Sequence, residues 1–289
     1  MASLGGTKIN PSKFHYSQLK FYFILVPVAL IMALPIVYIF SHAFKPIEEL
    51  FLWPPKFLVR RPTLKNFKDL MQTTSTAVPM ARYLFNSVAI TLGLVFVSIV
   101  ISTMAGYALS KLEFKLKKPL LILNNIALMF VGASVVIPRY LVVEKLGLLD
   151  NFLVYILPTV AMPVGLFLVK QFIDQIPQDL LEAARIDGAS DLRIYWSIIL
   201  PLIKPAIATI AIVSFQMAWN DAGIANLYID NEALKNFAFY MSTLTTQTNI
   251  VTGQGMAAAA ALIMFIPNLV IFIILQRNVM NTMAHSGIK

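Results

Sequence analysis

Apolar stretches of about 20 residues, the length that crosses a bilayer as a helix, alternate with shorter polar segments along this chain of 289 residues. Six stretches qualify as spans, at residues 21–43, 84–108, 119–142, 152–173, 203–227 and 256–276. The first is too long for the apolar core of a signal peptide, and no small-x-small cleavage site follows it. The pattern therefore predicts an all-α membrane protein with six transmembrane helices.

The composition fits a chain that lies mostly in a membrane. Hydrophobic residues make up 58% of the chain and charged residues only 13%, whereas a soluble domain normally carries about 25% charged residues. Cysteine is absent, and the three histidines His15, His42 and His285 lie far apart. We therefore expect no disulfide, no metal site, no catalytic residues and no bound cofactor. The net charge of +9 suits lipid headgroups better than nucleic acid, because the basic residues flank apolar spans.

Basic residues also predict the topology, since Lys and Arg are enriched in cytoplasmic loops. With both termini inside, the inner segments hold Lys111, Lys115, Lys117 and Lys118 among others, and the later outer loops hold few basic residues. We therefore predict a multi-pass protein of the cell membrane with both termini in the cytoplasm. Its parts are a tail at 1–20 and a transmembrane domain at 21–289, with an outer loop at 45–83, an inner loop at 174–202 and a tail at 277–289.

The first outer loop conflicts with the charge rule. It holds seven basic residues, Lys45, Lys56, Arg60, Arg61, Lys65, Lys68 and Arg82. The loop is long and rich in proline, so we expect a small folded cap outside the membrane. Phe51, Trp53 and Phe57 fit an aromatic belt at the membrane interface.

A spaced motif lies in the inner loop at 174–202. It reads Glu182-Ala183-Ala184, Gly188 after three further residues, Ile198 after nine more, and then Leu200-Pro201. Pro177 fits the first turn of a helix, and Gly188 can adopt the left-handed conformation that ends one. Ser190 can cap the next helix. We predict a short helix at about 177–187.

This spacing resembles the EAA loop of bacterial ATP-binding-cassette importers, with no gap and no substitution. The resemblance implies a type I importer fold in which this loop docks on a separate ATPase. The coupling element would be 177–191, and the coupling residues would be Glu182, Ala183, Ala184, Asp187, Gly188, Leu200 and Pro201. The chain has no G-x4-G-K-[ST] loop, so ATP and Mg would be used by the partner ATPase.

Further segments resemble the maltose-type carbohydrate permeases, specifically the shorter, six-span partner of such pairs. They include Pro54-Pro55-Lys56-Phe57, Asn86-Ser87, Ala105-Gly106-Tyr107-Ala108-Leu109, Leu146-Gly147-Leu148-Leu149-Asp150 and Trp219-Asn220-Asp221. The resemblance implies a heterodimer of two permeases, two ATPase subunits, an extracellular solute-binding protein and a sugar substrate. The tail at 277–289 departs from the family's usual ending.

Polar residues inside spans usually face a protein interior or a wet cavity. The candidates for the substrate path are Asn124, Asn125, Gln216, Trp219, Asn220 and Asp221. Amides can both donate to and accept from sugar hydroxyls, and tryptophan can stack on a sugar ring. For each residue the alternative is an interhelical hydrogen bond or packing. Asp221 is the strongest candidate, either in the path or as a gate or cap at its outer mouth.

Three other functions compete with a sugar importer. One is an importer permease for another polar solute such as a glycerophosphate. A self-contained secondary transporter would need internal repeats and acidic coupling sites, but Asp221 is the only carboxylate in the predicted spans. A membrane enzyme is disfavoured, because the sequence has no His/Glu metal pair, no close carboxylate pair in a span and no nucleophile elbow.

Overall fold

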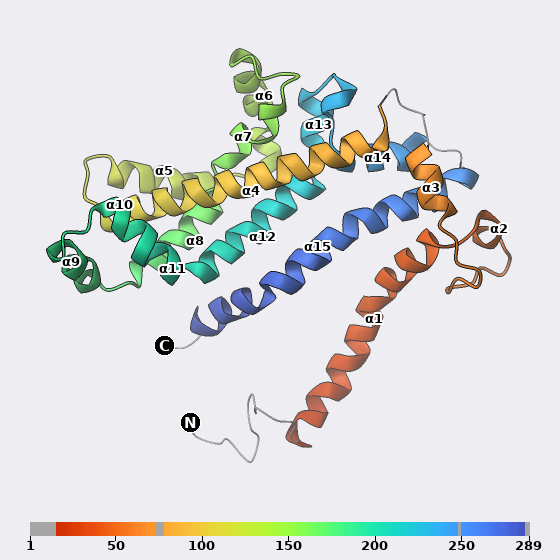
Figure 1. Ribbon diagram of the computed structural model, residues 1–289, viewed down its shortest axis with the longest axis horizontal. Helices are drawn as coiled ribbons and strands as arrows, with labels where there is room; N and C mark the ends of the chain where they lie inside the picture. The colour runs from red at the N-terminus through yellow and green to blue at the C-terminus, as the bar shows by residue number, and fades with distance from the viewer. Residues whose placement is uncertain (1–15, 73–77, 248–249, 287–289) are drawn as a thin grey trace. The chain divides into compact units, whose positions relative to one another are not determined.

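A computed structural model of the protein describes residues 16–72, 78–247 and 250–286 (Figure 1). Most of the predicted tail at 1–20 and the last three residues of the predicted tail at 277–289 lie outside this range. Contacts divide the chain into two units, one of residues 1–70 and 248–262, the other of 71–247 and 263–289. The described residues contain helices and no β-strand, which agrees with the predicted all-α class.

The α-helices in chain order are α1 (Leu19–Ala43), α2 (Ile47–Leu50), α3 (Lys65–Gln72), α4 (Met80–Lys111), α5 (Lys117–Met129), α6 (Val136–Lys145), α7 (Leu157–Val160), α8 (Pro163–Asp174), α9 (Gln178–Ile186), α10 (Asp191–Ile194), α11 (Leu200–Leu202), α12 (Lys204–Asn220), α13 (Gly223–Tyr228), α14 (Phe237–Gln247) and α15 (Ile250–Ser286). Short 3₁₀ turns cover Tyr16–Gln18, Gly132–Val135, Phe152–Tyr155 and Glu232–Leu234, and a π-helical turn covers Tyr195–Ile199.

The number of spans agrees with the prediction, but three of them are not straight helices. Helices α1 and α4 and the segment Gly253–Gln276 of α15 are long and apolar enough to cross a membrane. The other three candidates are pairs of helices: α5 with Gly132–Lys145, bent by 111°; Phe152–Val160 with α8, bent by 46°; and Asp191–Leu202 with α12, bent by 80°. The predicted spans at 119–142 and 152–173 correspond to the first two pairs, whereas the predicted fifth span at 203–227 begins and ends later than the third pair.

One of these breaks has a clear backbone cause. The fourth span breaks at Ala161 and Met162, directly before Pro163, which begins α8. Proline disfavours the helical conformation in the residue before it and has no N–H to donate. The predicted fifth span also ends earlier than expected, at a separate place: α12 ends at Asn220, and Asp221 is extended, with φ −84° and ψ 112°. A separate helix, α13, follows.

The third span breaks without a proline at the break. Phe130 and Val131 are extended, with ψ of 131° and 135°, and Pro138 lies eight residues after Phe130, inside the first turns of α6. Pro267, by contrast, lies within the continuous α15.

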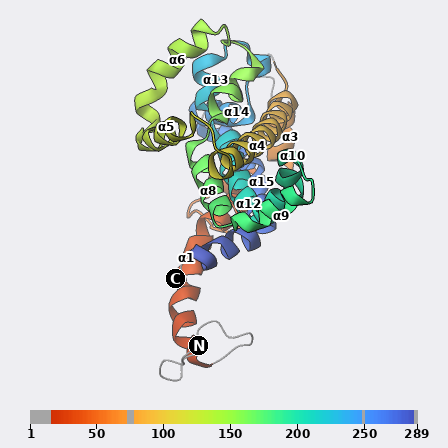
Figure 2. The same ribbon diagram turned by 90° about the vertical axis from the view of Figure 1, so that its left-hand side faces the viewer.

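Within the second unit, α4 packs against both α8 and α12 (Figures 1 and 2). Small residues four positions apart on α4, Ser98, Ser102 and Gly106, are all buried. A Cβ on Gly106 would lie 2.5 Å from Cγ1 of Val169 on α8, which real Cβ atoms essentially never show. Small side chains therefore allow the two backbones to approach closely, as in other membrane helix pairs.

In the first unit, hydrogen bonds fold the segment after α1 onto the end of that helix. Asn66 donates to the carbonyl oxygens of Ala43 (2.9 Å) and Lys45 (2.8 Å). The Lys45 side chain is only 2% exposed and donates to the carbonyl oxygen of Lys56. Burial lowers the pKa of the Lys45 ammonium, and the nearby Glu49 carboxylate acts in the opposite direction.

Candidate functional site

Helix α9 begins and ends where the sequence predicts. Pro177, with φ −57° and ψ 139°, lies immediately before it. At its other end the N–H groups of Gly188 and Ala189 donate to the carbonyl oxygens of Arg185 (3.0 Å) and Ala184 (2.9 Å). This pair of bonds is a Schellman motif, which needs a left-handed residue, and Gly188 has φ +81°. The helix predicted at about 177–187, ending at Gly188, is confirmed.

Helix α10 follows at once and is joined to α9. Ser190 caps it by accepting a hydrogen bond from the N–H of Arg193 (3.3 Å), as predicted. The Arg185 guanidinium forms a salt bridge with the Asp191 carboxylate at 3.1 Å. Because this pair is largely exposed, it adds little stability, but it bridges the turn between the two helices.

Most of the surface of α9 faces outward. Leu181 is fully buried, whereas Leu180 is 44% exposed and Ile186 is 86% exposed. Of the predicted coupling residues, Glu182, Ala183, Asp187, Gly188 and Pro201 are exposed, and Ala184 and Leu200 are half-buried. Two large apolar side chains, Leu180 and Ile186, therefore lie uncovered on this short helix.

The buried side of α9 belongs to a continuous apolar cluster that ties it to the long helices. Leu181 and Ile194 enter this cluster from the loop, Tyr107 enters it from α4, and further members come from α8 and α12: Val169, Ile173, Ala206 and Ile210. Within it the hydroxyls of Tyr195 and Thr103 are hydrogen-bonded at 2.8 Å, which links the π-helical turn to α4.

Polar contacts fasten the ends of α4 and α8 next to this cluster. Ser110 donates to the Asp174 carboxylate at 2.5 Å, and the Lys111 ammonium donates to the carbonyl oxygen of Ile176 at 2.6 Å. Lys170 forms a salt bridge with the same carboxylate at 2.6 Å. These contacts join the C-terminal ends of α4 and α8 to each other, next to the loop that carries α9.

Two of the predicted path residues share one exposed face of α12. Gln216 and Asn220 lie four residues apart and are exposed. Asn220 and Asn268 exchange amide hydrogen bonds, at 3.4 Å and 3.2 Å. A reciprocal amide pair of this kind offers both donors and acceptors and can exchange its partner for hydroxyl groups.

The neighbouring residues Trp219 and Asp221 are held by the protein itself. Trp219 is 4% exposed, and its indole N–H donates to the carbonyl oxygen of Met264 at 3.0 Å. The Asp221 carboxylate accepts from the N–H groups of Gly223 (2.6 Å) and Ile224 (3.3 Å). It therefore caps the start of α13.

The two asparagines predicted on α5 differ in their surroundings. Asn124 is half-buried and donates weakly, at 3.4 Å, to the carbonyl oxygen of Pro163 at the start of α8. Asn125 is exposed. They do not meet the group on α12 in any contact that the structure records among the described residues.

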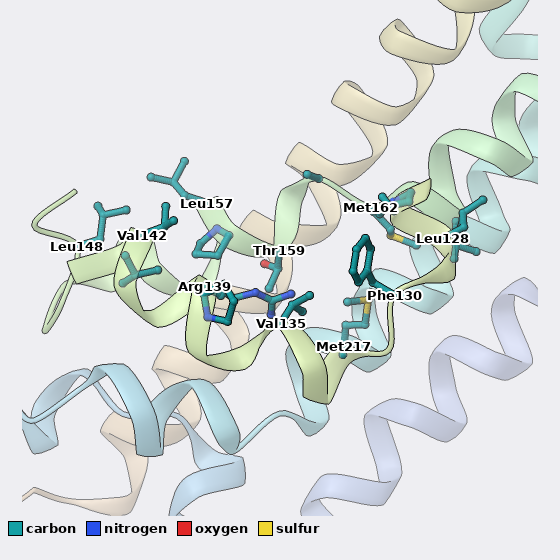
Figure 3. Close-up of a pocket in the computed structure, with 18 of the residues that line it drawn as sticks. Leu128, Phe130, Val135, Arg139, Val142, Leu148, Leu157, Thr159, Met162 and Met217 are labelled. Carbon is teal, nitrogen blue, oxygen red and sulfur yellow. The ribbon is translucent and has the colours of Figure 1, made fainter. Parts of the chain in front are cut away.

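The breaks in the third and fourth spans line a cavity of about 910 Å³ (Figure 3). Its walls are mostly apolar and include Phe130, Met162 and Met217. Arg139 and Thr159 also point into it (Figure 3). Irregular backbone at membrane depth is tolerated where it lines a cavity.

A second feature that the sequence analysis did not interpret holds the loop after α13. Asn86 donates to the carbonyl oxygens of Ala233 (2.9 Å) and Lys235 (2.8 Å), and Ser87 accepts from the N–H of Phe237 (2.8 Å). Two adjacent polar residues at the start of an apolar span are the signal that points to such a contact.

Comparison with known proteins gives one consistent result. The family described as "Binding-protein-dependent transport system inner membrane component" matches residues 14–280. Protein LplC of Bacillus subtilis is 33% identical over 279 residues, 91% of each chain. The polygalacturonan/rhamnogalacturonan transport system permease protein YtcP of the same organism is 35% identical over 73% of this chain and 72% of its own. The fold is similar to a chain in the crystal structure of a bacterial ABC transporter that imports the acidic polysaccharide alginate, with a TM-score of 0.80, 22% identity, and coverage of 92% and 99%.

Proposed function

This chain belongs to the family of binding-protein-dependent transport system inner membrane components, and we propose that it forms half of the path by which a saccharide crosses the membrane. A chain of this family is the permease subunit of an ATP-driven importer and is not itself the ATPase. The saccharide is supported by the polygalacturonan and rhamnogalacturonan named for the relative YtcP. The alternative of another polar solute, such as a glycerophosphate, is separated by the transport assay below.

The observation that carries the proposal is the form of α9. It presents an exposed surface with Leu180 and Ile186, and it is anchored by Leu181 in a cluster shared with the long helices. We infer that the 177–191 element docks in a groove of the ATPase. When two ATPase subunits close on ATP and Mg, they would move this element and the helix ends attached to it. Such rigid-body motion is a common way to switch a membrane path between two openings.

The translocation path requires a second permease, because six helices alone are too few to surround a path wide enough for a saccharide. We propose that the exposed face of α12 with Gln216 and Asn220, together with Asn268, faces the partner permease and the substrate. Asp221 and Trp219 then support this face rather than contact sugar in the state described. An extracellular solute-binding protein would deliver the substrate to the outer mouth, and both termini and residues 111–118 would lie in the cytoplasm.

The test is reconstitution of the chain with its partner permease and an ATPase. We expect the three to co-purify as one complex and the binding protein with bound saccharide to stimulate ATP hydrolysis. Uptake of a neutral oligosaccharide, a uronate oligosaccharide and a glycerophosphate is then compared in the same vesicles. Uptake by this chain alone, driven by an ion gradient without an ATPase, would contradict the proposal and favour a secondary transporter.

A further inference from the structure

The segment that follows α1 folds back beside the end of that helix. Ser41, in the last turn of α1, donates to the carbonyl oxygen of Phe57 at 2.7 Å. The rings of Phe57 and Tyr38 lie 5.8 Å apart. Tyr38 precedes the last residue of α1, Ala43, by five residues, or about 7.5 Å along a helix axis. Phe57 therefore lies beside the end of a candidate span and not beyond it.

Large apolar side chains close to Phe57 in the sequence are exposed. Trp53 is 90% exposed, Leu58 is 62% exposed and Leu52 is 47% exposed. Three such side chains in one short segment would be unfavourable in water, and an exposed apolar group of this kind marks an interaction surface. Tryptophan in particular is enriched at the level of lipid headgroups.

The same segment carries three cations near these side chains, Lys56, Arg60 and Arg61. The Glu49 carboxylate accepts hydrogen bonds from the backbone N–H groups of Arg60 (3.0 Å) and Arg61 (2.9 Å) and not from their guanidinium groups. Among residues 16–72, 78–247 and 250–286 the structure records no ion pair to these three side chains. They are therefore positioned to bind an anion outside the chain.

We propose that residues 51–61, which we call the outer lobe, bind anionic phospholipid headgroups in the outer leaflet. Leu52, Trp53 and Leu58 enter the headgroup region, and the cations of the lobe bind lipid phosphates, for which arginine is well suited. Basic residues near an anionic membrane surface are each attracted to it. The assignment of this lipid site to the outer leaflet rests on the topology proposed above, whereas the lipid contact itself does not. A lipid site explains why basic residues occur in a loop that the charge rule would leave poor in them.

The test uses the absence of cysteine from the chain. A nitroxide spin label is attached at Trp53→Cys in the assembled complex, whose other subunits have been made cysteine-free. The complex is placed in nanodiscs of phosphatidylcholine alone or with added phosphatidylglycerol. Collision with oxygen and with a water-soluble nickel complex gives the depth of the label. We expect it to lie about 5–10 Å into the headgroup and acyl boundary, and to lie deeper when phosphatidylglycerol is present.

A matched pair of variants tests the role of charge. In the neutral triple variant Lys56→Gln, Arg60→Gln, Arg61→Gln, the response to phosphatidylglycerol is expected to disappear. In the charge-preserving triple variant Lys56→Arg, Arg60→Lys, Arg61→Lys it is expected to remain. The loss of three charges should weaken phosphatidylglycerol binding on the order of a hundredfold, measured by retention of the lipid during purification.

Three results would overturn the lipid site. One is that, in both lipid mixtures, the label at position 53 is as accessible to the nickel complex as a fully water-exposed label. Another is a neutral triple variant that responds to phosphatidylglycerol like the parent chain. The third is protection of the label only when the solute-binding protein is added, which would assign the outer lobe to a protein partner. Uptake measured in the same preparations separates failure of the lipid site from failure of the importer function.

Discussion

Replacing Gly188 by valine should uncouple ATP hydrolysis from substrate without preventing membrane insertion. Gly188 has φ +81°, and a Cβ built there meets nothing within 4 Å. The cost is therefore conformational and not a clash within the chain. A left-handed conformation costs an L-residue roughly 1–2 kcal/mol, which changes the population of the correct helix end by about 5- to 30-fold. A β-branched residue lies at the unfavourable end of that range.

The chain contains a matched control for this experiment. Gly147 has φ +65° and also has no atom within 4 Å of a built Cβ, so Gly147→Val imposes the same local strain in another loop. ATP hydrolysis by the reconstituted complex, with and without loaded binding protein, is the assay. We expect stimulation to be lost in Gly188→Val and kept in Gly147→Val, and Gly188→Asn to keep much of it because asparagine tolerates positive φ. Normal stimulation in Gly188→Val would refute the docking of α9 on the ATPase.

Three further predictions concern topology, packing and the path. A reporter fused after Lys289 should lie in the cytoplasm, and a reporter inserted near Arg60 should lie outside the cell. A cytoplasmic reporter near Arg60 would show that the predicted topology is wrong. Gly106→Ala should lower thermal stability in detergent by about 1–3 kcal/mol through overpacking, and adding Val169→Ala should restore part of it; an unchanged melting temperature in the single variant would show that the two helices can separate at no cost. Asp221→Asn should keep the fold because asparagine caps as well as aspartate, whereas Asp221→Leu should lose about 1 kcal/mol and slow uptake; wild-type uptake by the leucine variant would limit the residue to packing.

The sequence predicted α9 well because its signals are local. Pro177 removes a donor that the first turn of a helix does not use, Gly188 supplies a left-handed residue and Ser190 supplies a capping oxygen. Each acts on neighbours within about five residues, so no tertiary information was needed. The same holds for α1 and α4, whose apolar length alone predicts a span.

The break in the third span and the end of α12 at Asn220 could not be predicted in this way. Hydropathy averages over a window and does not register that Phe130 and Val131 are extended, because both residues are apolar. The role of Trp219 was also open, because its indole N–H reaches Met264, 45 residues later in the chain. Asp221 was ranked as a path residue from the cost of a carboxylate in lipid. The turn after α12 supplies two N–H groups that account for it, and this turn has no signature at the level of composition.

Two of the breaks between paired helices differ in their surroundings, and this difference bears on the coupling of α9 to the membrane helices. The break between α11 and α12 at Ile203 is buried in the apolar cluster with Leu181, and close-packed interiors transmit displacement. The break at Ala161 and Met162 instead lines the 910 Å³ cavity, where fewer neighbours oppose a change in φ and ψ. A displacement of α9 should therefore carry the packed end as one body and be absorbed at the breaks beside the cavity, since residues at element ends commonly serve as hinges.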